Sequence, residues 1–133
     1  MFNLNHYDAV LQDSFRPEIL FLYANDRKTP VAIFDAEQVR RIIEEKLTKA
    51  VSQKGGVCWK FTSPGTAGVP DRIVLMPKGH IAFVEVKAPG EKPRKLQLSR
   101  HKLLRRLGFQ VYVLDALEDI DKIIKEVMSN EAS

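Results

Sequence analysis

The chain has 133 residues, of which 44% are hydrophobic, so it can build one packed domain but not two. Its 21 basic and 17 acidic residues give a formal net charge of +4, an excess too small to identify a partner by itself. The single cysteine, Cys58, excludes an intramolecular disulfide and a zinc site built from cysteines. Without a signal peptide or an apolar run approaching about 20 residues, the chain is expected to be soluble and cytoplasmic, with no membrane contact.

The first 34 residues are interpreted as an N-terminal extension. Two apolar runs, at residues 18–24 and 30–34, flank the turn-forming sequence Asn25-Asp-Arg-Lys, an arrangement typical of a β-hairpin. Residues 35–128 are expected to form the main domain, and residues 129–133 a tail.

A helix is predicted to begin after Asp35, because Gln38 three residues later completes the pattern of a capping box. Apolar residues then recur at helical spacing until Gly55 ends the helix. On this helix Glu44 falls at the margin of the apolar face, whereas Glu45 points nearly opposite. Only Glu44 is therefore expected to reach a site at the edge of the core.

Three strands are predicted next. Val57, Trp59 and Phe61 alternate with Cys58 and polar neighbours, which predicts a strand with Trp59 in the core. A loop at residues 63–70 follows, rich in glycine and proline. Residues 72–76 and 80–87 then form two β-rich runs around the turn sequence Pro77-Lys78-Gly79, which predicts a hairpin.

The last third of the chain predicts a helix, a strand and a helix. Pro93 opens a helix that Gly108 closes, with an apolar stripe of Leu96, Leu103, Leu104 and Leu107. Residues 110–114 form a strand, and Asp115 with Glu118 resembles a capping box for a final apolar-striped helix. The order after residue 35 is therefore α, β, β, β, α, β, α, which indicates an α/β fold with a mixed sheet flanked by helices.

Counting outward from the hairpin turn brings Asp71 opposite Glu85 or its neighbour, and Lys87 projects from the same strand face as Glu85. Two adjacent carboxylates repel each other unless a cation lies between them. Oxygen ligands suit Mg²⁺ or Mn²⁺, either of which can polarise a phosphate and activate water. Lys87 could orient or deprotonate that water, or stabilise the developing charge.

The alternative interpretation is an ordinary surface pair, because Glu-x-Lys recurs by chance on exposed strands. The joint occurrence of Pro70-Asp71, a short hairpin, Glu85-Val-Lys87 and an edge-facing Glu44 favours a metal site.

Basic residues cluster between positions 87 and 106, where Glu91 is the single acid. This run is interpreted as a phosphate-contacting surface in preference to a solvated helix face. His101 is the least secure of these contacts, since a histidine there is more often an ordinary surface residue. The expected DNA contacts are Lys60, Ser63, Arg72, Lys92, Arg94, Lys95, Arg100 and His101.

These motifs, taken in order, resemble the virus-type replication-repair nuclease (VRR-NUC) family of the PD-(D/E)xK superfamily, over about residues 37–125. The resemblance is carried by Gly68-Val-Pro-Asp-Arg-Ile73 and Phe83-Val-Glu-Val-Lys-Ala-Pro-Gly90, together with Lys60-Phe-x-Ser-Pro-Gly65, Gln97 and Leu107-Gly-Phe-x-Val-Tyr-Val.

The resemblance implies a restriction-endonuclease-like core and assigns roles within it. Asp71, Glu85 and the backbone carbonyl of Val86 would hold the metal, with Glu44 as the helix acid, in contact directly or through water. Lys87 would be the catalytic lysine, and Gln97 a polar contact from the following helix. Stand-alone members, often encoded by phages or prophages, are homodimers related to enzymes that resolve Holliday junctions.

The leading hypothesis is a DNA endonuclease, dependent on Mg²⁺ or Mn²⁺, that acts on structured or branched DNA. The alternative is a nuclease-fold module that binds DNA without cleaving it. Adjacent carboxylates favour the enzyme, because they would repel phosphate in a pure binder. A homodimer would supply two sites for two strands. The apolar N-terminal segment could form its interface or could pack on its own core as an extra hairpin, and both alternatives stay open.

Overall fold

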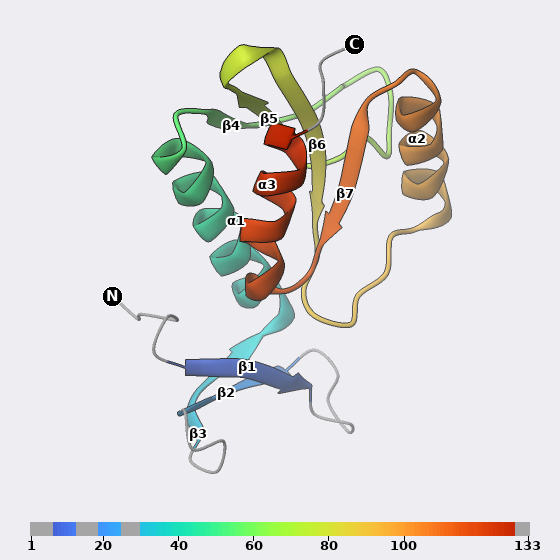
Figure 1. Ribbon diagram of the computed structural model, residues 1–133. Helices are drawn as coiled ribbons and strands as arrows, with labels where there is room; N and C mark the ends of the chain where they lie inside the picture. Colours follow the sequence, from blue (N-terminus) through green and yellow to red (C-terminus); the bar gives the residue numbers. More distant parts are fainter. Residues whose placement is uncertain (1–6, 13–18, 25–29, 130–133) are drawn as a thin grey trace.

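The computed structural model describes residues 7–12, 19–24 and 30–129, with side chains described from residue 35 onward. Its main body is a four-stranded sheet with helices α1 (Ala36–Gln53) and α3 (Ile120–Ser129) on one face, and helix α2 (Lys95–Arg106) beside the opposite face (Figure 1). The predicted order α, β, β, β, α, β, α is confirmed. In the described part of the chain, no helix combines the length and the apolar character needed to cross a bilayer.

The sheet is mixed, as the sequence predicts. Its strands β4 (Val57–Lys60), β5 (Arg72–Met76), β6 (His80–Val86) and β7 (Gln110–Leu114) lie side by side in that order. The pairs β4–β5 and β5–β6 are antiparallel, and β7 runs parallel to β6. Lys78 and Gly79 both adopt positive φ in the tight turn between β5 and β6. Arg72 pairs with Val84 in this hairpin, so the preceding residue, Asp71, faces Glu85.

Helix α1 begins as predicted from Asp35. The Asp35 side chain accepts from the backbone N–H of Gln38 at 2.8 Å, and the Gln38 side chain accepts from the backbone N–H of Asp35 at 3.0 Å. The apolar face of the helix is buried against β4, β6 and α3. The main core therefore lies between the sheet and α1 with α3, and its helical members are Val39, Ile43, Leu47, Val51, Ile120, Ile123, Ile124 and Val127.

Three expectations about the elements are wrong. Helix α3 does not start from a capping box at Asp115, because a short 3-10 turn at Leu117–Asp119 precedes it and Ala116 makes no side-chain cap. Trp59 is 59% exposed, since its neighbour Cys58 is the side chain that faces α1. On α2 the leucines Leu96, Leu98 and Leu103 are exposed and Leu104 is only partly buried, whereas the fully buried side chains are polar, namely Gln97 and His101.

The N-terminal part forms a separate three-stranded sheet. Its strands β1 (Tyr7–Gln12), β2 (Ile19–Ala24) and β3 (Pro30–Asp35) are antiparallel and lie in chain order. The two apolar runs interpreted as hairpin strands correspond to β2 and β3, and β1 is an additional strand that the sequence did not indicate. Strand β3 leads directly into α1, so this sheet lies near the first turn of that helix (Figure 1).

Candidate active site

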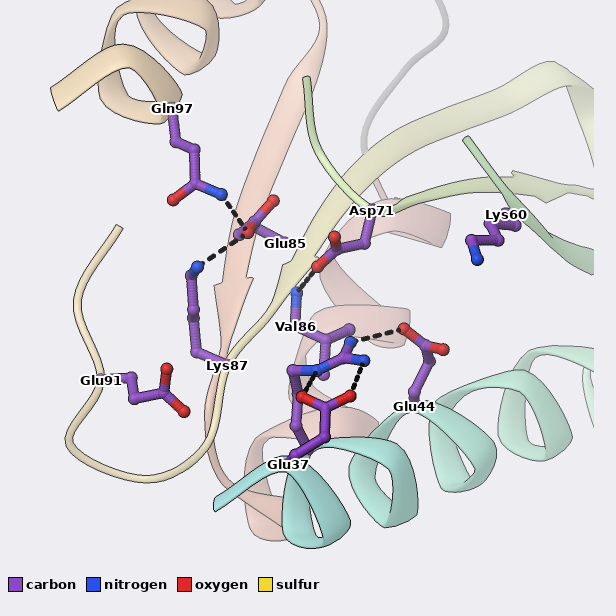
Figure 2. Close-up of a pocket in the computed structure, with 10 residues that line it drawn as sticks. Glu37, Glu44, Lys60, Asp71, Glu85, Val86, Lys87, Glu91 and Gln97 are labelled. Atoms are coloured by element: carbon purple, nitrogen blue, oxygen red, sulfur yellow. Dashed lines mark hydrogen bonds and ion pairs between the residues drawn. The ribbon is translucent and has the colours of Figure 1, made fainter. Parts of the chain in front are cut away.

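A hollow of about 380 Å³ opens where β5 begins and β6 ends, between the first half of α1 and the start of α2 (Figure 2). Five acidic and three basic side chains contribute to it, so charged residues make up most of its lining. The lining residues are Glu37, Arg40, Glu44, Lys60, Asp71, Glu85, Val86, Lys87, Glu91 and Gln97.

The hairpin brings two carboxylates together at the centre of this hollow. Asp71 Oδ2 accepts a hydrogen bond from the backbone N–H of Val86 at 2.9 Å, which ties the start of β5 to the end of β6. Glu85 is only 1% exposed, and its Oε1 atom has no hydrogen-bond partner among the described residues. Burial raises the pKa of Glu85, and the negative charge of Asp71 raises it further.

This arrangement fits a divalent cation. A buried carboxylate with one unpartnered oxygen, next to a second carboxylate, gains most from a neighbouring positive charge, and hard oxygen ligands suit Mg²⁺ or Mn²⁺. Among the described residues, no group of three or more His, Cys, Asp or Glu side chains gathers closely enough to enclose a metal. A cation here would therefore rest on Asp71 and Glu85, with backbone and water oxygens completing its shell, as Mg²⁺ commonly allows.

Lys87 and Gln97 both hold the other oxygen of Glu85. Lys87 Nζ lies 3.1 Å from Glu85 Oε2, and Gln97 Nε2 donates to the same oxygen at 2.8 Å (Figure 2). The amide oxygen of Gln97 in turn accepts from the backbone N–H of Arg94 at 2.8 Å, at the start of α2. Gln97 thus links the beginning of α2 to the central carboxylate.

Glu44 lines the hollow from α1, whereas Glu45 is exposed and is not among the lining residues. Two arginines fix the Glu44 carboxylate: Arg72 Nη2 donates to Oε1 at 3.0 Å and Arg40 Nη1 donates to Oε2 at 3.2 Å. Glu44 lines the same hollow as Asp71 and Glu85, and because both of its oxygens are engaged by arginines, it would reach a cation there through water.

The predicted DNA contacts divide into two groups. Lys60 lines the hollow, and Lys92, Arg94 and Lys95 are exposed on the segment that leads into α2. Ser63 is partly buried in the loop that precedes β5. The exposed members of this first group stay candidates for phosphate contact.

The other three predicted contacts have different surroundings. The prediction for His101 is wrong: the ring is 0% exposed, because it lies one turn after Gln97 on the buried face of α2. Arg72 points inward and also donates to the backbone carbonyl of Cys58 at 3.3 Å. Arg100 Nε donates to the carbonyl of Ala67 at 2.9 Å and so anchors the loop at residues 63–70 to α2.

Three lining residues were not anticipated from the sequence: Glu37, Arg40 and Glu91. Glu37, Arg40 and Glu44 are spaced three and four residues apart on one helix, which is the spacing of side-chain ion pairs and was a usable signal. Glu91 lies in the connection between β6 and α2, where no periodicity marks it.

Residues 30–117 match the model of the VRR-NUC domain, more than half of the chain. The chain belongs to the VRR-NUC nuclease family. The matched residues include Glu44, Asp71, Glu85, Lys87 and Gln97, whereas β1, β2 and α3 lie outside them.

Two similar proteins support the VRR-NUC assignment. The "Putative nuclease p44" of Acyrthosiphon pisum secondary endosymbiont phage 1 is 52% identical over 85 residues, which are 64% of this chain and 90% of that protein. A solved structure of a VRR-NUC domain is 31% identical and aligns with a TM-score of 0.61, covering 65% of this chain and 94% of that one. The resemblance inferred from the sequence motifs is therefore confirmed, and so is the fold class.

Proposed function

We propose that this VRR-NUC domain is a DNA endonuclease that hydrolyses phosphodiester bonds with Mg²⁺ or Mn²⁺. The observation that carries the proposal is the Asp71–Glu85 pair: two facing carboxylates, one of them buried with an unpartnered oxygen, beside the ammonium group of Lys87. A module that only bound DNA would gain nothing from these carboxylates, because they repel phosphate.

Each residue of the site has a distinct part in this mechanism. Asp71, Glu85 and the carbonyl of Val86 would hold the cation, with Glu44 contributing through water. When bound, the cation supplies positive charge to the phosphate and acidity to a nearby water. Lys87 orients the attacking water or stabilises the charge that develops on the phosphate. Gln97 keeps Glu85 in place, because it holds the carboxylate while its own amide oxygen is fixed at the start of α2.

Structured or branched DNA is the proposed substrate. The resemblance of stand-alone VRR-NUC proteins to junction-resolving enzymes supports this choice, while the exposed cations Lys92, Arg94 and Lys95 support DNA binding in general. These cations contact the phosphate backbone in the proposed complex, which gives affinity without base specificity.

We further propose a homodimer, which would place two sites against two DNA strands. The β4–β6 part of the sheet face opposite α1, away from α2 beside β7, offers a surface for it. Val57, Leu75 and Ile81 form one row across β4, β5 and β6, and Trp59 adjoins Ile73 in the next row. Trp59 is 59% exposed, Val57 40% and Ile81 38%, so this face leaves apolar area open to a second copy.

Trp59→Glu should turn the dimer into a monomer in light scattering, because it places a charge in the proposed interface. A variant that stays dimeric would move the interface elsewhere, with the N-terminal sheet as the remaining alternative from the sequence. A monomeric unaltered chain would contradict the dimer itself.

The decisive test of cleavage is incubation of the full chain with supercoiled plasmid and a panel of DNA junctions, in Mn²⁺ or in EDTA. We expect cleavage in Mn²⁺ alone, loss of it in Asp71→Ala and Glu85→Ala, and retained DNA binding in both variants. A chain that binds these DNAs but cleaves none of them would instead be the non-cleaving binding module.

A further inference from the structure

Arg40 is a cation of the hollow to which neither the family motifs nor the mechanism above gives a part. Its guanidinium makes a two-pronged contact with Glu37, in which Nη2 donates to Oε1 at 2.7 Å and Nε donates to Oε2 at 3.0 Å. The remaining nitrogen, Nη1, donates to Glu44. The planar fork of arginine binds carboxylates and phosphates in the same way, with two parallel hydrogen bonds.

The two acidic partners of Arg40 differ in how firmly they are held. Glu44 is 18% exposed and is also bonded to Arg72, whereas the Glu37 side chain is 56% exposed and its other ionic contact is Arg41 at 3.8 Å. The two-pronged geometry makes this ion pair stronger than most surface pairs, but the Glu37 side chain is 56% exposed, so water can solvate its carboxylate when it leaves Arg40. Glu37 is therefore the partner that can leave.

The charge balance of the hollow favours the departure of Glu37 from Arg40. The hollow has five acidic residues against three basic ones without a metal, and three against three if a divalent cation neutralises Asp71 and Glu85, so in neither state does it carry a net positive charge for phosphate. Rotation of Glu37 into solvent would leave one uncompensated positive charge at Arg40. The pKa of Arg40 is raised above its ordinary value, first by the hydrogen bond to Glu37 and to a smaller extent by the charges of Glu44 and Asp71. The guanidinium thus lies within electrostatic reach of Asp71.

We propose that Arg40 is a DNA-phosphate-binding residue of this site and that Glu37 occupies its guanidinium until DNA displaces it. The inference rests on the proposed function in one respect, namely that the substrate is DNA. The phosphate takes the two-pronged contact that Glu37 gives up, and the Arg40–Glu44 contact is kept. Glu37 thus acts as an internal competitor that weakens DNA binding by the free protein.

A double-mutant cycle tests this exchange. DNA affinity and its salt dependence are measured by fluorescence anisotropy in EDTA, with a junction and a duplex, for the full chain and for Glu37→Gln, Arg40→Gln and the double variant. We expect Glu37→Gln to tighten binding by roughly threefold to tenfold, and Arg40→Gln to weaken it and to lower the salt slope by about 0.9, the value for one phosphate contact. In the double variant the gain from Glu37→Gln should disappear, because no guanidinium is left to release.

The same helix supplies matched controls. Glu45→Gln makes the same charge change as Glu37→Gln at an exposed position outside the hollow, and Lys49→Gln removes one positive charge, as Arg40→Gln does, at an exposed position of the same helix that does not line the hollow. Both controls should change affinity by less than their counterparts. If Arg40→Gln fails to fold, Arg40→Lys replaces it in the cycle, because it keeps the charge and loses the fork.

Three outcomes would overturn the exchange. The first is an unchanged affinity of Glu37→Gln, and the second is an equal gain from Glu37→Gln with and without Arg40, which would mean simple charge repulsion. The third is an absence of DNA binding by the unaltered chain, which would also remove the proposed function. If the unaltered chain cleaves DNA but Glu37→Gln leaves the DNA affinity unchanged, this inference is wrong and the proposed function stands. A chain that binds DNA without cleaving it, but shows the full cycle, would leave it standing.

Discussion

Asp71→Asn should make the metal-free protein more stable and at the same time remove its response to metal. Asparagine has nearly the shape of aspartate, and its amide oxygen can still accept the 2.9 Å hydrogen bond from the N–H of Val86. The change therefore removes a charge and little else. In the absence of a cation that charge opposes Glu85, whose carboxylate is 1% exposed and whose pKa is raised by burial first and by Asp71 next.

The magnitude follows from the free energy of the repulsion. Facing side chains on neighbouring antiparallel strands contribute about 0.2–1 kcal/mol per pair, and like charges directly opposite each other are destabilising. We therefore expect Asp71→Asn to raise the free energy of unfolding in EDTA by about 1 kcal/mol, or Tm by about 3–5 °C for a domain of this size. In Mn²⁺ at a hundred times its Kd, the free energy of unfolding of the unaltered chain should rise by about 2.7 kcal/mol, whereas that of Asp71→Asn should rise little. The unaltered chain should therefore be the less stable protein in EDTA and the more stable one in Mn²⁺.

Thermal and urea unfolding in EDTA and in Mn²⁺ would measure both effects. Glu45→Gln serves as the control, because this exposed residue lies outside the hollow and should change neither value. A variant less stable than the unaltered chain in EDTA would refute the repulsion argument. Equal stabilisation of both proteins by Mn²⁺ would refute the assignment of Asp71 as a metal ligand.

Three further predictions concern single side chains. Lys87→Ala should lower the cleavage rate by about 10²–10⁴-fold, yet keep the stabilisation by Mn²⁺, because Lys87 touches Glu85 without being a ligand. Glu44→Gln should slow plasmid cleavage far more than Glu45→Gln, and equal effects would contradict the placement of Glu44 on the wall of the hollow. Burial lowers the pKa of the His101 ring in the folded protein below its value of about 6.5 in the unfolded chain. Protonation therefore favours the unfolded chain, so the contribution of the neutral ring to the free energy of unfolding is complete above about pH 6.5 and is lost as pH falls through the folded pKa. His101→Leu should reduce that loss in urea unfolding below pH 6.5, and an unchanged acid loss would show that other groups cause it.

The parts of the fold that were predictable depend on local rules. Helix α1 follows from the capping pair Asp35 and Gln38 and from an uninterrupted apolar period, both readable within 20 residues. The meeting of Asp71 with Glu85 follows from the turn at Lys78 and Gly79, because the two-residue period of strands lets the register be counted outward from it.

The parts that were not predictable depend on which face of an element has a partner. Trp59 alternates as a core residue would, but its face of β4 carries no helix in the described part of the chain, so the ring is exposed. On α2 the leucine period predicted the buried side wrongly. The side that is buried in the structure is the one where Gln97 donates a hydrogen bond to Glu85. A contact between two polar residues distant in sequence leaves no apolar pattern by which it could be predicted.

Glu85 itself distinguishes a cation site from a surface ion pair better than the Glu-x-Lys spacing does. Lys87 and Gln97 both bind its Oε2 atom, while the buried Oε1 atom has no partner among the described residues. A fold that merely tolerated this carboxylate would be more stable with both oxygens bonded, because an unpartnered buried oxygen lowers stability. Here the open oxygen coexists with a second carboxylate, Asp71, which adds repulsion to the same group. A divalent cation would relieve both costs at once, which is the physical ground for the metal site that we propose here.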